Sequence, residues 1–205
     1  DFCLSRGLGD VYKRQALAGP RTQGPDQVQV WDISTGQMVW KADMQARFRA
    51  AAWSGNGKWL AVATEIAVQL RDSGTGQVLQ SYSGYIGVVT SISWSPDSTY
   101  LASSESGGTV RLQSVSSGQS RPFFSTGGAE PIIFVAWSPK GRYLAFSPTD
   151  DTVQIWDISA KRRIATCSVG GENSALALAW SPDGTMIATA DTSILEGFEI
   201  WRAIP

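Results

Sequence analysis

The chain has 205 residues, with 17 Lys and Arg against 18 Asp and Glu, and 42% of its residues are hydrophobic. This balance is typical of ordinary globular domains and disfavours proteins that bind nucleic acid or a membrane surface, which carry clustered basic residues. Because histidine is absent, the chain lacks the usual general base and the commonest metal ligand. We therefore expect no catalytic residue, no cofactor and no metal site.

Two further exclusions concern membranes and disulfides. No apolar run reaches the about 18 residues that a membrane-spanning helix needs, so we expect no membrane contact by this segment. Cys3 and Cys167 are too far apart in the sequence to suggest a disulfide framework or a metal pattern.

In chain order, residues 1–15, "DFCLSRGLGDVYKRQ", share no pattern with the rest of the chain, whereas from residue 16 two phrases alternate. The first is an apolar run, a turn and a second apolar run, as in "LAWSPDGTMIATA". Its tryptophans lie 41 to 43 residues apart, at Trp53, Trp94, Trp137 and Trp180. The second phrase, as in "VQVWDISTGQ", has an anchor position held by Trp31, Arg71, Gln113, Trp156 and Trp201.

Each period is predicted to contain about four short strands. The runs are rich in Val, Ile, Leu, Ala and Trp, and no stretch has a helical period. Ser-Pro-Asp-Gly predicts one tight turn, and the glycine of "STGQ" predicts another because glycine tolerates positive φ. A four-stranded sheet cannot bury both faces alone, so the units are expected to stack face to face.

These residues resemble the WD-repeat β-propellers. The period of 40 to 45 residues, "AWSPDG" and the Trp-Asp dipeptides Trp31-Asp32 and Trp156-Asp157 carry the resemblance, which covers residues 16–205. It implies an all-β fold with four-stranded blades, here a partial ring of about four and a half. The predicted units are 16–47 (a partial blade), 48–87, 88–131, 132–174 and 175–205, the last lacking its outer strand.

The sequence also departs from the family. The family's Gly-His dipeptide is missing, since Met44, Tyr85, Gly128 and Gly171 stand nine residues before the tryptophans of the first phrase. The buried tetrad of Asp, His, Ser or Thr, and Trp is therefore not expected to form fully in any blade. Asp150, at the tetrad Asp position, is expected to hold its own turn, with a metal role beside Asp151 as the alternative.

Residues 1–15 interrupt the repeat in the middle of a predicted strand, because Leu17 aligns with Ile187 and a tryptophan is then expected at position 10. Natural domain boundaries fall in linkers, so we interpret this segment as foreign sequence, similar to a translated sequencing adaptor. The remainder is expected to be the C-terminal part of a larger ring.

The resemblance implies a non-catalytic scaffold for protein–protein interactions that binds a protein or peptide. Such a domain could serve as the C-terminal sensor or interaction domain of a larger protein, such as a bacterial protein kinase. The alternative is the propeller domain of an enzyme, such as a hydrolase, with its active site elsewhere. We expect a cytoplasmic protein, or an extracytoplasmic one if a membrane helix lies upstream.

Candidate binding residues lie in the segments between blades, where loops project from a rigid scaffold. Exposed aromatic residues and arginine are enriched among binding hot spots, which favours Tyr85 and Arg47. The full candidate set is Arg47, Phe48, Tyr85, Ile86, Glu130, Glu172 and Asn173.

Overall fold

The computed structural model describes residues 3–5, 14–19, 25–149, 152–168, 177–190 and 198–203. Its strands form five antiparallel sheets in chain order. The first sheet contains β1 (Cys3–Ser5), β2 (Arg14–Gly19), β3 (Gln27–Asp32) and β4 (Gln37–Asp43). The second contains β5 (Phe48–Trp53), β6 (Trp59–Thr64), β7 (Val68–Asp72) and β8 (Val78–Tyr82).

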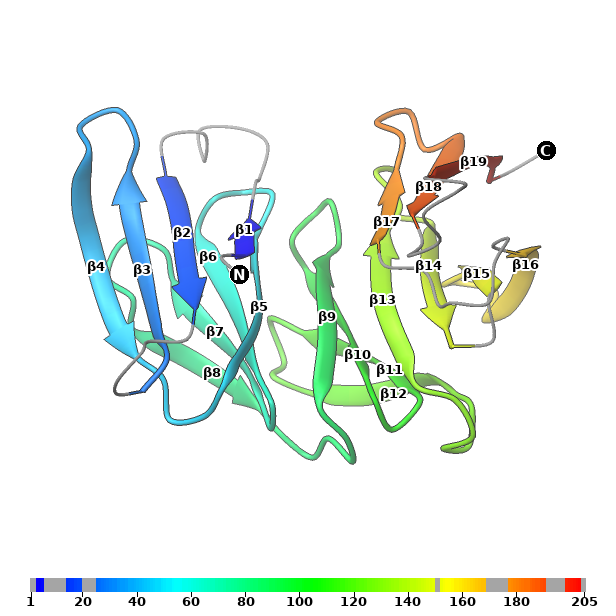
Figure 1. Cartoon of the computed structure of the whole chain (residues 1–205), viewed down its shortest axis with the longest axis horizontal. Coiled ribbons are helices and arrows are strands. Elements are labelled where there is room, and N and C mark those ends of the chain that lie inside the picture. Colours follow the sequence, from blue (N-terminus) through cyan, green and yellow to red (C-terminus); the bar gives the residue numbers. More distant parts are fainter. Residues whose placement is uncertain are drawn as a thin grey trace.

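The later sheets repeat this arrangement. The third contains β9 (Val89–Trp94), β10 (Tyr100–Glu105), β11 (Thr109–Ser114) and β12 (Ser120–Ser125). The fourth contains β13 (Ile132–Trp137), β14 (Tyr143–Pro148), β15 (Thr152–Asp157) and β16 (Arg162–Ser168). The fifth contains β17 (Ala177–Trp180), β18 (Met186–Ala190) and β19 (Phe198–Arg202). Figure 1 shows the first and fifth sheets on opposite sides, so the sheets do not close into a ring.

The core lies between the sheets. Successive side chains of a strand point to opposite faces, so β6 sends Leu60 and Val62 into the cluster shared with the first sheet. Its Ala61 and Ala63 face the cluster shared with the third sheet. Two further clusters lie between the third and fourth sheets and between the fourth and fifth. Each inner sheet is therefore buried on both faces, as the repeat predicts.

Hydrogen bonds close the two predicted turns. In the Ser-Pro-Asp-Gly turn of the fifth sheet, the Gly184 N–H donates to the Ser181 carbonyl at 2.8 Å, and the serine hydroxyl accepts from the Met186 N–H at 2.9 Å. In the other turn, the Asp32 carboxylate accepts from the Ser34 and Thr35 N–H groups.

The second Trp-Asp dipeptide has the same role. Asp157 accepts from the Ala160 N–H and the Ser159 hydroxyl, and Arg142 donates to it at 2.9 Å. These bonds hold the pKa of Asp157 well below its ordinary value. The aspartates of both dipeptides are thus structural turn residues.

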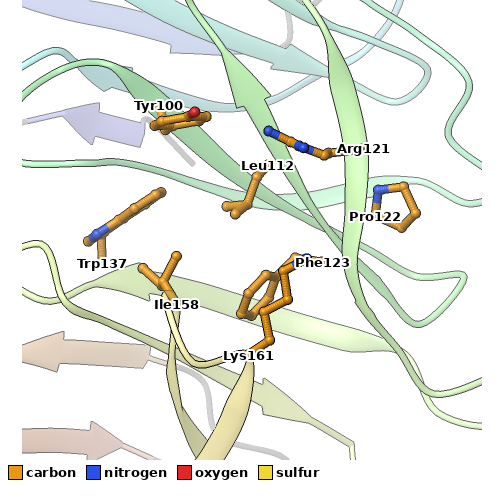
Figure 2. A pocket seen from close by; sticks show the side chains of 8 residues that line it. All are labelled: Tyr100, Leu112, Arg121, Pro122, Phe123, Trp137, Ile158 and Lys161. Atoms are coloured by element: carbon orange, nitrogen blue, oxygen red, sulfur yellow. The ribbon is translucent and has the colours of Figure 1, made fainter.

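Indole groups join neighbouring sheets. The Trp94 Nε1–H donates to the Ala52 carbonyl at 2.9 Å, and the Trp180 Nε1–H donates to the Ala136 carbonyl at 3.1 Å. Trp137 differs, because its Nε1–H donates to Gly141 of its own turn. A pocket of about 280 Å³ opens at this junction, between the third and fourth sheets (Figure 2).

The structure confirms the all-β propeller prediction and corrects one alignment. Gln15, not Leu17, pairs with Trp31, as Ile187 pairs with Trp201. Leu17 pairs with Gln29, so the alignment of Leu17 with Ile187 is wrong by two residues. The assignment of residues 1–15 to foreign sequence stays a prediction, and Asp150 and Asp151 lie outside the described residues.

Candidate functional site

Two kinds of loop share one end of the sheets: those joining the second and third strands of a sheet, and those joining one sheet to the next. We call the part built by residues 44–48, 65–67, 83–88 and 106–108 the loop face. Backbone bonds tie these loops together: the Glu65 N–H donates to the Arg47 carbonyl at 3.1 Å, and the Val89 N–H donates to the Glu65 carbonyl at 3.4 Å. The loop face is therefore a connected surface across the second and third sheets.

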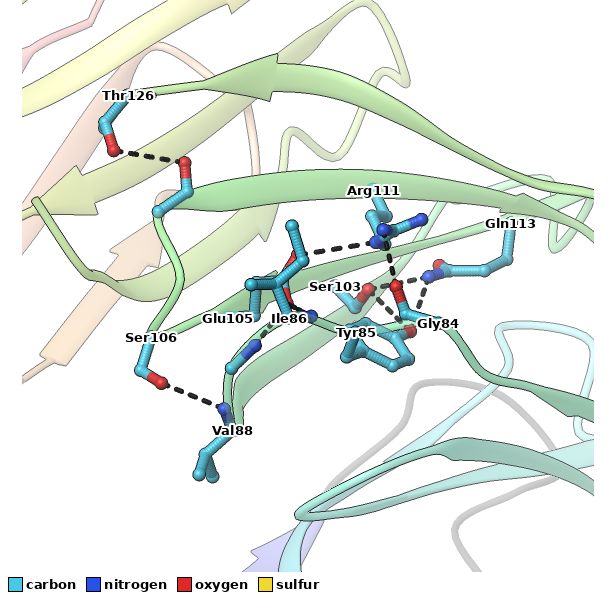
Figure 3. Close-up of polar contacts among 12 residues, drawn as sticks. Gly84, Tyr85, Ile86, Val88, Ser103, Glu105, Ser106, Arg111, Gln113 and Thr126 are labelled. Carbon is cyan, nitrogen blue, oxygen red and sulfur yellow. Dashed lines mark hydrogen bonds and ion pairs between the residues drawn. The ribbon is translucent and has the colours of Figure 1, made fainter. Parts of the chain in front are cut away.

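A buried carboxylate fixes the loop between these two sheets. Glu105, at the end of β10, is 0% exposed, and its Oε2 accepts from the Ile86 N–H at 2.6 Å and the Gly87 N–H at 3.0 Å. Its Oε1 accepts from Arg111 Nε at 3.4 Å (Figure 3). A Cβ at Gly87 would collide with the Gly107 nitrogen, so only glycine allows this close approach. The loop is held rigidly, which lowers the entropic cost of binding through it.

Tyr85 belongs to a second polar group beside Glu105. Its hydroxyl lies 3.0 Å from Ser103 Oγ and accepts from Gln113 Nε2 at 2.8 Å, while Arg111 covers its ring at 5.4 Å (Figure 3). Burial raises the pKa of Tyr85 to about 12. The side chain is half-buried, so the expectation that Tyr85 is an exposed loop aromatic is corrected.

This group occupies positions of the missing tetrad. Tyr85 stands where the family has His, and Gln113 stands at the anchor position usually held by Trp. In the first, second and fourth sheets the anchor residue instead bonds a glutamine two positions earlier: Trp31 to Gln29, Arg71 to Gln69 and Trp156 to Gln154. The third sheet thus has a different hydrogen-bonded group at these positions, formed by Tyr85, Ser103 and Gln113. This group lies under the loop face and supports it.

The remaining predicted residues have different surroundings. Arg47 is exposed, and Ile86 is 83% exposed, whereas Phe48 packs on the first core cluster. Glu130 accepts a hydrogen bond from the Thr149 hydroxyl and belongs to the next loop along the chain. Glu172 and Asn173 lie outside the described residues. The structure therefore brings Arg47, Tyr85 and Ile86 into one loop face, while Glu130 lies at its edge, where its carbonyl approaches Gly108.

One residue of the loop face was not predicted from the sequence. Ile66, in the turn between β6 and β7, is 67% exposed and lies on the loop that bonds both Arg47 and Val89. The candidates predicted from the sequence lie in the segments between blades, whereas this turn lies within a blade. The sequence feature that could have identified Ile66 is a large apolar residue beside the charged Glu65, in a turn where polar residues are expected.

The charges of the loop face are largely paired. Arg49 donates to Glu65 at 2.6 Å on the surface, and Arg111 pairs with Glu105 underneath. The exposed residues of this face include polar ones, such as Gln45, Ser83 and Ser106, but its large exposed apolar side chains are Ile66 and Ile86, with Arg47 beside them. Isolated exposed isoleucines are unremarkable, but two on neighbouring rigid loops form a candidate contact surface.

The described part of the chain meets the requirements neither of a metal site nor of a membrane-spanning helix. Within these ranges, no three acidic or cysteine side chains are placed to hold a metal ion, and no helix is long and apolar enough to cross a membrane. Cys167 is buried, and burial raises the pKa of its thiol.

Comparison with known proteins finds the same repeat. The pattern of the family described as "WD domain, G-beta repeat" matches residues 76–113, 116–157 and 162–195, which is more than half of the chain. The chain is also 32% identical over 94 residues to the small ribosomal subunit protein RACK1y of Oryza sativa subsp. japonica. It is 27% identical over 94 residues to RACK1z of the same organism. Each match covers 42% of this chain and 28% of the relative. With its sheets, turns and inter-sheet indoles in the same register, the chain belongs to the WD-repeat family.

Proposed function

We propose that this chain is a protein-interaction scaffold that binds a protein or peptide partner through the loop face, with Ile66 and Ile86 as its apolar contacts. Membership of the WD-repeat family supports a scaffold in general. The observation that carries the assignment to this surface is the exposure of two isoleucines on loops joined by the bond from Val89 to Glu65.

Rigidity is the physical reason for preferring this surface. The loop of Ile86 is fixed by the two backbone bonds to Glu105, so on binding its side chain loses rotamer freedom but its backbone needs no further ordering. Burying both isoleucines in a partner contributes about 1.5–3 kcal/mol for each side chain. That is the scale of a binding hot spot.

Peptide display on the full chain tests this proposal without knowledge of the natural partner. Peptides selected on the wild-type protein are then measured against the double variant I66S/I86S. We expect their dissociation constants to rise by roughly tenfold or more, because hot-spot contacts of this kind are lost. The melting temperature should stay unchanged, since both side chains face solvent.

The matched control removes two apolar side chains of comparable type from elsewhere. Val78 and Leu79 on β8 are 41% and 50% exposed and lie away from the loop face. V78S/L79S should bind the selected peptides like the wild type. Equal weakening by both double variants would contradict the proposal.

Two finer assignments stay predictions. One joins this scaffold to a larger bacterial protein such as a protein kinase, and the other places it in the cytoplasm. The enzyme alternative places the active site outside these residues. It differs from the scaffold proposal because the propeller would then have to contact a catalytic domain of the same protein.

A further inference from the structure

The pocket between the third and fourth sheets lies at the opposite end of the sheets from the loop face. It opens where β11 and β13 end and where β15 turns into β16. Its apolar wall is formed by Tyr100, Leu112, Phe123, Trp137 and Ile158. Figure 2 shows these side chains around one space, with Arg121 and Lys161 at different points of its rim.

The same place is filled at the two preceding junctions. A Cβ at Gly76 would lie 2.6 Å from the Trp40 ring, so the indole of the first sheet covers the turn of the second. Gln80 covers Gly118 in the same way and would collide with such a Cβ. In the fourth sheet, the corresponding turn residue is Lys161, with a φ of 50°.

The aromatic residues differ as well. Between the second and third sheets, Trp59 and Trp94 stack with ring centroids 6.1 Å apart. The corresponding pair between the third and fourth sheets is Tyr100 and Trp137. The Trp137 indole donates to Gly141 of its own turn, not to a carbonyl of the neighbouring sheet, and its ring lines the pocket. Thus the pocket results from changes at several positions of one junction.

The charge of the pocket is one-sided. Arg121 and Lys161 are both exposed at its rim, and no acidic side chain is among its described lining residues. Arg162 and Arg163 follow Lys161 and are also exposed. Asp157, the acidic residue of this turn, is already engaged by Arg142 at 2.9 Å. The rim therefore favours an anionic ligand.

The volume limits what can enter. At about 280 Å³ the pocket lies just under the usual range of roughly 300–1,000 Å³ for small-molecule sites, and it suits one large side chain with its adjoining backbone. We infer that this pocket binds a peptide segment that inserts one aromatic or large aliphatic side chain and places flanking Asp or Glu residues on Arg121 and Lys161. The segment would bind independently of any partner on the loop face.

Three synthetic peptides test the inference on the full chain at low ionic strength, by fluorescence polarisation. The acidic probe is acetyl-Asp-Glu-Phe-Glu-Asp-amide; one control replaces Phe by Ala, and the other replaces all four acids by Lys or Arg. We expect only the acidic Phe peptide to bind, and its affinity to fall as salt is added. Equal binding of the Ala peptide would show simple charge attraction and would overturn the inference, as would no binding of the Phe peptide.

Two double variants locate the site. R121Q/K161G removes both rim cations, and glycine at position 161 restores the residue type found at Gly36, Gly76 and Gly118, so the fold should be kept. Its dissociation constant should rise by about five- to tenfold, the scale of two exposed ion pairs. K41Q/K58Q removes two exposed cations outside the pocket lining and should bind like the wild type.

The variants also separate this inference from the proposed function. Equal weakening by both cation variants, or no weakening by R121Q/K161G, would overturn the pocket assignment. I66S/I86S leaves the pocket unchanged and should bind the acidic Phe peptide normally, so either proposal can fail alone.

Discussion

Glu105→Ala tests whether a buried carboxylate holds the loop face together. In the native protein Glu105 accepts from the Ile86 and Gly87 N–H groups and from Arg111. The variant leaves these donors without that acceptor. The Arg111 side chain is 15% exposed, so it regains little hydration in compensation.

The magnitude follows from these contacts. Hydrogen bonds to a charged group contribute about 1.5–3 kcal/mol each, and removing one partner of a buried ion pair costs about 3–5 kcal/mol. The two figures describe overlapping losses, so we expect the free energy of unfolding to fall by about 3–5 kcal/mol. For a chain of this size, that lowers the melting temperature by roughly 6–20 °C.

Glu65→Ala is the matched control. Glu65 also pairs with an arginine on the same face, at 2.6 Å, but the side chains of Arg49 and Glu65 are 40% and 32% exposed. An exposed pair contributes at most about 1 kcal/mol, so this variant should melt close to the wild type. Circular dichroism gives both melting temperatures, and amide exchange at Ile86 should accelerate only in Glu105→Ala. Equal melting temperatures for the two variants would refute the reasoning.

Two further predictions concern a turn glycine and the half-buried Tyr85. Gly76→Ala should cost about 2–4 kcal/mol, because a Cβ at φ 74° would collide with the Trp40 ring, while Gly36→Ala, with open space at φ 68°, should cost only about 1 kcal/mol; urea unfolding of both measures the difference. Burial raises the pKa of Tyr85 from 10.0 to about 12, so its contribution to stability is present below pH 10 and is lost as pH rises through 12. Stability of Tyr85→Phe measured between pH 10 and 12 should therefore fall less steeply than that of the wild type, and an equal slope would count against desolvation of the Tyr85 hydroxyl.

The fold is predictable because its determinants are local and repeated. Strand alternation, the Ser-Pro-Asp-Gly turn and the glycine of the second turn recur in register, and each acts within a few residues. Where the repeat is imperfect, the alignment fails: the distance from Trp31 places Leu17 at the paired position, but strand pairing puts Gln15 there. Counting residues along the chain does not show how many of them belong to the connecting loop and how many to the paired strands.

The candidate site is predictable only in outline. Position along the chain places Arg47, Tyr85 and Ile86 on one face, because segments between sheets share an end of the fold. Sequence could not reveal that Tyr85 turns inward, since this depends on Ser103 and Gln113 from other strands. The role of Glu105 could not be predicted either, because the residues around it in the sequence do not indicate that its carboxylate binds a distant loop.

The junctions between sheets also bear on how a repetitive chain finds its order. Near-identical units can pair with the wrong neighbour or exchange places between molecules, which is the usual misfolding route of repeat proteins. Here the first three junctions each have a contact of their own: Trp40 reaches the Ser73 carbonyl, Tyr82 reaches the Ser114 carbonyl, and Phe124 packs on Phe146. A sheet packed in the wrong order would leave a hydrogen-bond acceptor without its donor, or an aromatic ring without the ring that it packs against. These individual contacts thus favour the native succession of the first four units over a shuffled one.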